Sequence, residues 1–454
     1  MHDYGLLTLL PVLIIIVLAT ITRSSFEPLV VGILIGCVIA YHENFLNKFI
    51  EHLTTALTDK SSGWVILVCM MYGSLITMMI RGGGTIAFSN FLLKFVKNRR
   101  GALLASWVLG ILIFVDDYLH SLAVGAAMKK ITDKYLISRE MLAYIVHATS
   151  APLCILLPIT TWSIFISGIL EKNNVVPAGQ GMYGYMQTMP YMVFGFVGIA
   201  LVLLVVLGKV PLLGKMKKAE ARAATGVTVP PEPSKVVEEA EKELEFVKKS
   251  KLSYFLLPLA VLLATTVYFD FDALKGALIA NFFTFFYFLV DGALSLRQLS
   301  DAILKGFNTI LFPIILVILA FAMKLVNDDL HLVPYVIAHV EPYMSRALFP
   351  AIAFLTLATI AFLTSTSWDL YVIAIPLIVP LAQDLQVNVW LAVSTVVGAG
   401  AFGSGSGFFS DSTILCASST ECPPMVHALS QLPYALMALA VSTVGYVIVG
   451  AWMA

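Results

Sequence analysis

The chain has 454 residues, of which 59% are hydrophobic and only 12% charged, and its mean hydropathy is +0.90. Soluble domains carry about 25% charged residues, so the composition excludes a soluble globular protein and indicates an all-α protein with many membrane segments. The formal net charge of +0 gives no support to a nucleic-acid partner. We therefore expect a multi-pass protein whose surroundings are the lipid bilayer.

Apolar runs recur along the whole chain, and a full span of a bilayer requires about 20 residues. The first run lacks a basic start and a small-residue cleavage site, so we interpret it as a retained helix. Several later runs are short or contain Pro or Gly, which favours discontinuous helices or re-entrant hairpins, and we expect roughly 11 to 14 membrane segments. The predicted segments are Leu6–Ile21, Leu29–Tyr41, Trp64–Ile80, Ala102–Val124, Leu142–Leu170, Tyr191–Leu207, Tyr254–Phe269, Leu274–Val290, Ile303–Leu325, Leu348–Leu363, Leu370–Leu381, Val389–Phe402 and Leu429–Trp452.

One polar interval, residues 209–251, divides the chain into two membrane halves, residues 1–208 and 252–454. Lysines flank the interval on both sides, and an excess of Lys near helix ends is typical of the cytoplasmic side. We interpret the interval as a charged, solvated cytoplasmic linker. Asp117 and Asp133 in the first half are spaced like Asp369 and Asp384 in the second. An apolar run that ends in small residues follows each pair, which favours two repeats of one unit.

The first candidate site is the segment FVDDYLHS, residues 114–121, inside an apolar run. Asp117 and His120 are three residues apart and share one face of a helix. Two adjacent carboxylates are costly in a membrane and are typical of ion or proton sites. The alternative is that Asp116 or Asp117 caps a half-helix. We favour Asp117 as the functional carboxylate and include Asp116 as a candidate for proton coupling.

The second candidate site lies in a helix that is predicted to begin at Ser138. His147, Thr149 and Ser150 precede Pro152 and Pro158 in this segment. Each proline removes a backbone donor and frees a carbonyl, so we expect the helix to break beside them. Freed carbonyls and hydroxyls are ligands for a small hard cation such as Na⁺. The alternative for His147 is a hydrogen-bonded core residue, which is the usual state of a lone histidine in an apolar helix.

The third candidate site is FLTSTSWDLYVIAIP, residues 362–376, where a run of hydroxyl side chains precedes Asp369. Ser367 or Asp369 is a possible N-cap of the following helix. The same segment also fits the tip of a hairpin whose hydroxyls meet a substrate. The two interpretations are compatible, and both stay open on the sequence alone.

The fourth candidate site is the stretch rich in Gly, Ser and Thr at Gly398–Thr420. Within a bilayer every backbone N–H and C=O needs a partner, so such a run is tolerated only where it lines a cavity or packs inside protein. Ser410, Asp411 and Ser412 cluster where the glycine-rich part ends. Asp411 is a candidate both for an N-cap and for the charge of a cation site, because broken helices hold ions in transporters.

Enzymatic function has little support in this sequence. It contains no nucleophile elbow, no phosphate-binding loop, no zinc-protease motif and no dinucleotide fingerprint. The five cysteines show no spacing of a zinc site or a disulfide framework. We expect a transporter that needs no cofactor beyond Na⁺ or H⁺ as coupling ions.

The chain resembles the NhaC-type sodium/proton antiporter family of the ion transporter superfamily. The resemblance is carried by FVDDYLHSLAVG, ISREMLAYIVHATSAP, the Ser-Trp pair before Asp369, SDSTILCASS and VHALSQLPYAL. It implies two inverted repeats, hairpins that meet at mid-membrane and exchange of Na⁺ for H⁺ in the cytoplasmic membrane. Some relatives exchange organic acids or move amino acids, so a coupled carrier of such a solute is the alternative. A homodimer is expected from the superfamily alone.

Two positions depart from the family pattern. The family commonly has an aspartate where His147 stands, and an acid and a histidine in the segment that here contains Ser404. Fewer carboxylates weaken a Na⁺ site and leave room for a larger or anionic solute. Under the leading hypothesis, Asp117 and either Asp369 or Asp411 bind H⁺ or Na⁺ in turn during alternating access. The ligands predicted to complete the coordination shell are Thr149, Ser150, Ser410 and Ser412.

Overall fold

The computed structural model describes residues 4–22, 26–92, 94–114, 116–158, 160–177, 179–231, 250–269, 272–365 and 367–454. These residues form helices and connecting turns and no strand, which confirms the all-α class. The charged pattern in the second half of the linker lies outside the described residues. The side chain of Asp369 is likewise outside them, although its backbone belongs to a helix.

Helices make up most of the described part of the chain. In chain order they are α1 (Leu10–Thr22), α2 (Phe26–Tyr41), α3 (Phe45–Thr58), α4 (Lys60–Arg81), α5 (Gly84–Leu92), α6 (Arg99–Leu112), α7 (Asp117–Lys134), α8 (Arg139–Leu156), α9 (Thr161–Lys172), α10 (Gly181–Thr188), α11 (Val193–Val206), α12 (Gly214–Ala224), α14 (Ser253–Tyr268), α15 (Ala273–Val290), α16 (Leu296–Asp329), α17 (Leu332–Val340), α18 (Phe349–Thr364), α19 (Trp368–Asp384), α20 (Val389–Ser406), α21 (Asp411–Thr420) and α22 (Pro424–Met453). Short 3-10 turns at Gly5–Leu9, His42–Asn44, Met189–Tyr191 and Glu341–Tyr343 join some of them.

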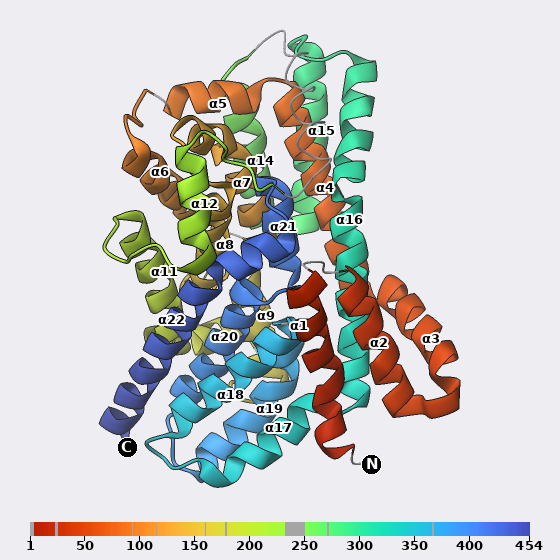
Figure 1. Ribbon diagram of the computed structural model, residues 1–454, viewed down its shortest axis with the longest axis vertical. Coiled ribbons are helices and arrows are strands. Elements are labelled where there is room, and N and C mark those ends of the chain that lie inside the picture. The colour runs from red at the N-terminus through yellow and green to blue at the C-terminus, as the bar shows by residue number, and fades with distance from the viewer. Residues whose placement is uncertain are drawn as a thin grey trace.

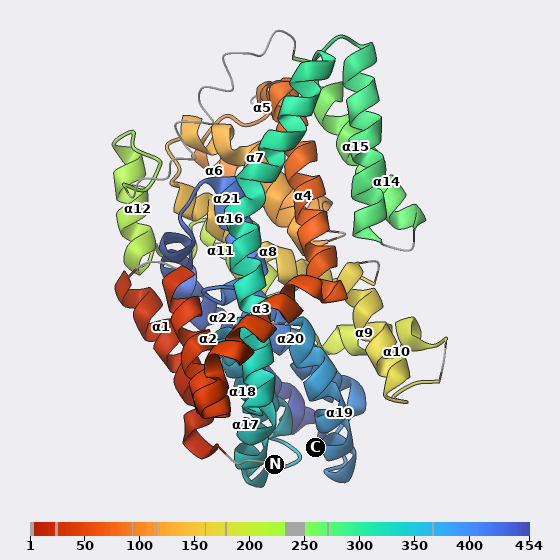
Figure 2. The same cartoon turned by 90° about the vertical axis from the view of Figure 1, so that its right-hand side faces the viewer.

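The molecule is elongated, and the long helix α16 runs along it beside α4 (Figure 1). Helices α14 and α15 flank the upper half of this pair, and α1 to α3 flank its lower half (Figures 1 and 2). Broken helices fill the interior, where α8 contacts α20 and α7 contacts α21. Because α8 and α20 are almost fully buried, their polar side chains can reach only other parts of the protein.

Four helices among the described residues are long and apolar enough to cross a membrane, and up to seven segments qualify if each of three bent pairs counts as one span. Another four helices are apolar but shorter. The bent pairs confirm the prediction of discontinuous helices. The predicted single run at Ala102–Val124 is in fact two helices, because the chain leaves helical geometry between Leu112 and Asp117.

A repeat is visible in the helix boundaries. The same shift of 250 residues takes Arg139 to Val389, Leu156 to Ser406 and Thr161 to Asp411, so the pair α8–α9 matches α20–α21. The turn before each pair contains a left-handed residue, Leu136 with φ of 54° and Gln386 with φ of 57°. This shift pairs Asp117 with Ser367, rather than with Asp369 as the aspartate spacing had suggested.

The two matched helices run in opposite directions. His147, midway along α8, contacts the carbonyl of Ser404 at the end of α20. The C-terminal end of α8 lies near α10, because the carbonyl of Ile155 accepts a hydrogen bond from the Tyr185 hydroxyl. Gly184 of α10 in turn lies close to Trp390 at the start of α20. Antiparallel equivalent helices are the geometry of an inverted repeat.

The glycine-rich run is not a loop. Helix α20 continues through it to Ser406, and the break is confined to residues 407–410. The glycines allow neighbouring helices to approach closely: a Cβ on Gly400 would lie 2.3 Å from the Tyr371 ring, and a Cβ on Gly403 would lie 2.3 Å from the Cβ of Ala361. The run therefore packs inside protein, which is one of the two outcomes that its backbone chemistry permits.

The first part of the predicted linker is docked rather than solvated. Glu220 of α12 is 3% exposed and accepts hydrogen bonds from the backbone N and the Oγ of Ser138, at 2.9 and 2.6 Å. Arg99 forms an ion pair with the same carboxylate. Arg222 binds both oxygens of Glu140 at 2.9 and 2.8 Å. These contacts attach α12 to the start of α8.

Candidate functional site

Four half-helices begin near the middle of the molecule. Side-chain contacts link the starts of α7, α9, α19 and α21: Asp116 contacts Thr161, Trp162 contacts Trp368, and Tyr118 contacts Asp411. Each helix N-terminus carries unsatisfied N–H groups and a partial positive charge. A group of N-termini is therefore a suitable place for carboxylates and for the charges that they exchange.

Asp116 is the N-cap of α7. Its Oδ1 accepts hydrogen bonds from the backbone N–H groups of Tyr118 and Leu119, both at 3.0 Å. Its Oδ2 accepts one from the Thr161 hydroxyl at 3.0 Å. Both oxygens are thus engaged in holding the starts of α7 and α9 together. Of the two alternatives for the adjacent aspartates, the structure gives the cap to Asp116.

Asp117, the next residue, is buried and differs from Asp116 in its bonding. Its Oδ1 accepts a hydrogen bond from the indole N–H of Trp162 at 2.9 Å. Its Oδ2 is buried and has no hydrogen-bond partner among the described residues. The hydroxyl of Ser121, four residues later, is also buried and unbonded, and residues four apart lie on the same helix face. Asp117 thus presents an oxygen that is available to a proton or a cation.

Asp411 belongs to the same centre but is not the N-cap of its helix. The N-cap of α21 is Ser410, whose Oγ accepts from the backbone N of Thr413 at 3.1 Å. Asp411 occupies the first helical position, where its Oδ1 accepts from the N–H of Ser412 at 2.8 Å. Its Oδ2 accepts a hydrogen bond from the Tyr118 hydroxyl. Tyr118 therefore joins α7 to α21 next to Asp117.

Ser367 lies at the start of α19 and is 4% exposed, and its side chain makes no capping hydrogen bond. It lines a cavity of about 40 Å³ together with Ser365, Trp368, Asp411 and Lys324. Lys324 was not identified by the sequence reasoning. A single lysine inside the apolar stretch of α16 was nevertheless a signal, because an ionisable residue within a membrane segment indicates a functional site by default.

His120 and Thr149 have local structural roles. The two ring nitrogens of His120 lie 2.9 Å from the carbonyl oxygen of Ile113 and 3.1 Å from the Thr149 Oγ. His120 thereby holds the carbonyl at the break between α6 and α7. Thr149 and Ser150 also contact carbonyls of their own helix, at 2.7 Å for Ile145 and 2.9 Å for His147.

Of the two prolines expected to break this helix, Pro158 lies at the break and Pro152 does not interrupt it. Helix α8 continues past Pro152 to Leu156, and the chain breaks only at residues 157–160. A proline inside a buried helix is tolerated because the freed carbonyl is surrounded by protein rather than by lipid. The hydroxyl of Thr160 donates at 2.8 Å to the carbonyl of Cys154, which Pro158 leaves without its helical donor. Thr149 and Ser150 therefore do not lie at an opening of the helix.

His147 belongs to a second, separate polar cluster. Its Nε2 lies 3.0 Å from the carbonyl oxygen of Ser404, and its Nδ1 lies 3.0 Å from His427 Nε2 and about 3 Å from the Gln431 amide. Because a carbonyl only accepts, Nε2 of His147 carries the hydrogen and Nδ1 accepts one. The Nδ1 of His427 is buried and has no partner among the described residues.

Hydroxyl groups extend this cluster towards Asp411. Ser410 and Ser412 donate to the same Ser404 carbonyl at 2.7 and 2.9 Å, and the Ser404 and Ser412 hydroxyls lie 2.8 Å apart. Ser412 is the neighbour of Asp411 in the chain. The serines predicted to complete one cation shell therefore surround His147, whereas Thr149 and Ser150 bond within α8. The structure does not bring the predicted ligands to one point.

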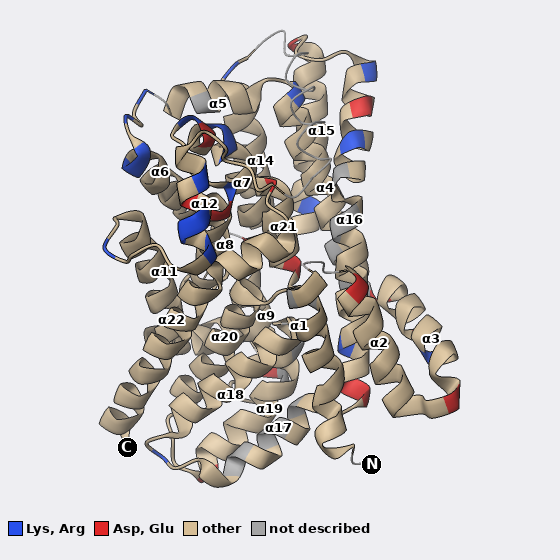
Figure 3. Ribbon diagram, in the orientation of Figure 1, with Lys and Arg blue, Asp and Glu red and all other residues tan. Residues whose placement is uncertain are grey.

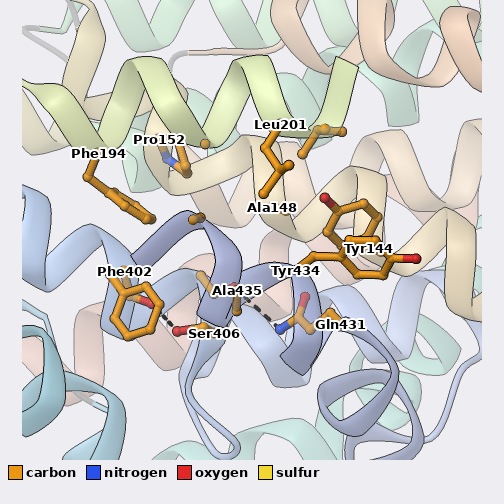
Figure 4. Close-up of a pocket in the computed structure, with 14 residues that line it drawn as sticks. Tyr144, Ala148, Pro152, Phe194, Leu201, Phe402, Ser406, Gln431, Tyr434 and Ala435 are labelled. Atoms are coloured by element: carbon orange, nitrogen blue, oxygen red, sulfur yellow. Dashed lines mark hydrogen bonds between the residues drawn. The ribbon is translucent and has the colours of Figure 1, made fainter. Parts of the chain in front are cut away.

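A cavity of about 30 Å³ lies beside the histidine cluster (Figure 4). Gln431 and Tyr434 of α22 line it from one side, and Tyr144 and Ala148 of α8 from the other. The amide of Gln431 also donates to the carbonyl of Gly405 at 3.3 Å. This volume is sufficient for one or two waters beside the side chain that contacts His147.

No three His, Cys, Asp or Glu side chains among the described residues are arranged to bind a metal ion. Zinc and similar metals require such a set. Na⁺ is a hard cation that is bound by carboxylate, hydroxyl and carbonyl oxygens, as Ca²⁺ and Mg²⁺ are. The donors present in the centre, Asp117, Ser121 and Asp411, are of this oxygen type.

Comparison with known families decides the class. The Na⁺/H⁺ antiporter family matches residues 179–451, which is more than half of the chain. The chain belongs to this family. It is a secondary transporter of the antiporter type and a multi-pass membrane protein that carries an ion or a small molecule.

Individual relatives are more distant. A protein of Haemophilus influenzae, described only as uncharacterized, is 26% identical over 483 aligned residues, which cover 98% of this chain and 90% of that protein. The Alcanivorax borkumensis YdaH transporter is 14% identical over 90% of this chain and 89% of its own, with a TM-score of 0.40. Neisseria gonorrhoeae MtrF, described as an antimetabolite efflux pump, is 12% identical over 96% and 94%, with a TM-score of 0.41. No residue role is transferred from these proteins.

Proposed function

We propose that the protein exchanges Na⁺ for H⁺ across the cytoplasmic membrane, and that Asp117 carries the exchanged ion. The observation on which the proposal rests is the buried, unbonded Oδ2 of Asp117 at the start of α7. Taking a carboxylate out of water without a partner is strongly unfavourable. A proton or a small cation on this oxygen removes that cost, and only one of the two fits at a time.

The oxygen chemistry around Asp117 supports Na⁺ as the second ion. The unbonded hydroxyl of Ser121 is on the same helix face as Asp117. Tyr118, the next residue in the chain after Asp117, donates a hydrogen bond to the Asp411 carboxylate. Asp116 positions the group by capping α7 and bonding Thr161. In this proposal Asp117 is the exchanging group, Asp411 adds negative charge, and Asp116 fixes the geometry.

The directions of the half-helices support alternating access. Helices α7 and α21 extend from the centre towards the lysine-rich end, where Arg139 bonds the carbonyl of Thr420, whereas α9 and α19 extend towards the opposite end (Figures 1 and 3). Lys and Arg gather around α6 and α12 at that end (Figure 3), which makes it the cytoplasmic side by the positive-inside rule. Movement of one pair against the other would open the centre to each side in turn.

The test uses purified protein in liposomes with an acid interior and an internal pH dye. Added Na⁺ should dissipate the gradient with wild-type protein and not with Asp117→Asn, which keeps the Trp162 hydrogen bond but cannot exchange a proton. The control is Asp116→Asn, which preserves the capping oxygen and should exchange. Full Na⁺-dependent exchange by Asp117→Asn would refute the assignment. If only an organic acid or an amino acid dissipates the gradient, the protein is the coupled carrier named above as the alternative and not a Na⁺/H⁺ exchanger.

A further inference from the structure

Lys324 is an ionisable residue that the exchange mechanism above does not use. It lies in α16 after the apolar stretch ILFPIILVILAFAM and is only partly exposed. A lysine within a membrane segment is unfavourable, and such residues usually face a protein interior or a water-filled cavity and pair with another group. Its position therefore calls for a partner inside the protein.

The cavity at the start of α19 identifies the surroundings of this lysine. Lys324 from α16, Ser365 and Ser367 from the α18–α19 break, and Asp411 from α21 line one space of about 40 Å³. The remaining lining residues are the apolar Val317, Ala320, Phe321 and Trp368. Lys324 and Asp411 thus line one small, mostly apolar cavity, where opposite charges attract more strongly than in water.

The size of the cavity limits what can bind there in this conformation. About 40 Å³ holds a few water molecules or one partly dehydrated monovalent cation. A small cation that enters the cavity meets Asp411 and Lys324 in the same space.

The charges in the centre also favour a role for Lys324 as a neutralising group. Asp116, Asp117 and Asp411 contribute three carboxylates, and Lys324 is the only Lys or Arg among the described residues that line the cavity. The ammonium group is attached to α16, which packs against α21. It can therefore neutralise Asp411 while it stays attached to the protein. A transported ion, by contrast, must leave.

We propose that Lys324 is a tethered cation that neutralises Asp411 in the ion-free centre and is displaced when Na⁺ binds. The inference rests on the proposed Na⁺/H⁺ exchange and adds a residue that sets its affinity. Na⁺ must compete with the ammonium group, so the lysine weakens Na⁺ binding and prevents the centre from retaining the ion. It acts through Asp411 and is a positioning residue rather than an ion ligand.

The test is the Na⁺ concentration that gives half-maximal exchange at fixed pH in liposomes. Lys324→Gln removes the competing charge and should lower this KM about tenfold, a typical size for the coupling between two ligands. Lys324→Arg keeps the charge and should leave KM within about twofold of wild type. Lys305→Gln, on the same helix but outside the cavity, is the matched control and should leave KM unchanged. A purely structural role would lower the amount of inserted protein and leave KM unaltered.

Binding without transport provides a second measurement. A ligand that binds the folded state stabilises it in proportion to its affinity, so Lys324→Gln in detergent should be stabilised by Na⁺ at lower concentrations than Lys324→Arg. If Lys324→Gln and Lys324→Arg have the same KM for Na⁺ and are stabilised at the same Na⁺ concentrations, the inference is overturned. Failure of the proposed function is distinguishable, because wild-type protein would then show no Na⁺-dependent exchange at all.

Discussion

The division of work between the two adjacent aspartates can be tested at Asp116. Replacement by Ala removes the acceptor of two backbone N–H groups and of the Thr161 hydroxyl, all at 3.0 Å. Loss of an N-cap costs about 0.5–2 kcal/mol, and buried donors without a partner cost about 1–3 kcal/mol. We expect Asp116→Ala to lower the unfolding free energy by about 2–3 kcal/mol. Asp116→Asn keeps the capping oxygen and should cost less than about 1 kcal/mol.

The assay combines stability and transport for the same two variants. SDS titration in mixed micelles measures the unfolding free energy, and dye-loaded liposomes measure Na⁺-dependent exchange. Asp116→Asn should be nearly as stable as wild type and should exchange, whereas Asp116→Ala should be destabilised. If Asp116→Asn is stable but inactive, the charge of Asp116 takes part in transport, and the division of work between the two aspartates is refuted.

Two further predictions concern close packing and the docked linker. Gly403→Ala places a Cβ 2.3 Å from the Cβ of Ala361 and 2.7 Å from its backbone carbon, so we expect a loss of about 1–3 kcal/mol in SDS titration; wild-type stability would show that α18 and α20 separate easily. Glu220→Ala leaves the backbone N–H of Ser138 without its acceptor and should cost about 1–3 kcal/mol. Trypsin should then cut the lysines of α12 faster, while Glu220→Gln should resist it, and equal cutting rates would contradict the docking.

The sequence was sufficient for the class of the protein and for the existence of its broken helices. Few charges, long apolar runs and scattered Pro and Gly lead to helices that break inside a membrane, because a bilayer allows backbone groups no other partners. Asp117 and Asp411 were predicted as site residues for the same reason: an ionised group in lipid is costly and indicates function by default. The family resemblance agreed with the match that the later comparison found.

The exact breaks were less predictable. Pro152 suggested an opening beside Thr149 and Ser150, but α8 continues past it to Leu156. The predicted membrane segment ended at Phe402, but α20 continues to Ser406, and α18 and α19 pack closely against its glycines. Such outcomes depend on which neighbours satisfy the backbone or fill the space, and neighbours distant in sequence leave no local pattern.

By itself, the sequence determined that this is a polytopic helical transporter with carboxylates inside its membrane segments, since hydropathy and the cost of buried charge are local properties. Only the tertiary structure decided what each carboxylate does. It gives one oxygen of Asp116 to the cap of α7 and the other to the Thr161 hydroxyl, and it leaves one oxygen of Asp117 unbonded. It also brings Lys324 into the cavity of Asp411. The physical reason is that a hydrogen bond or a cavity depends on groups from several helices, and the packing of those helices brings them together.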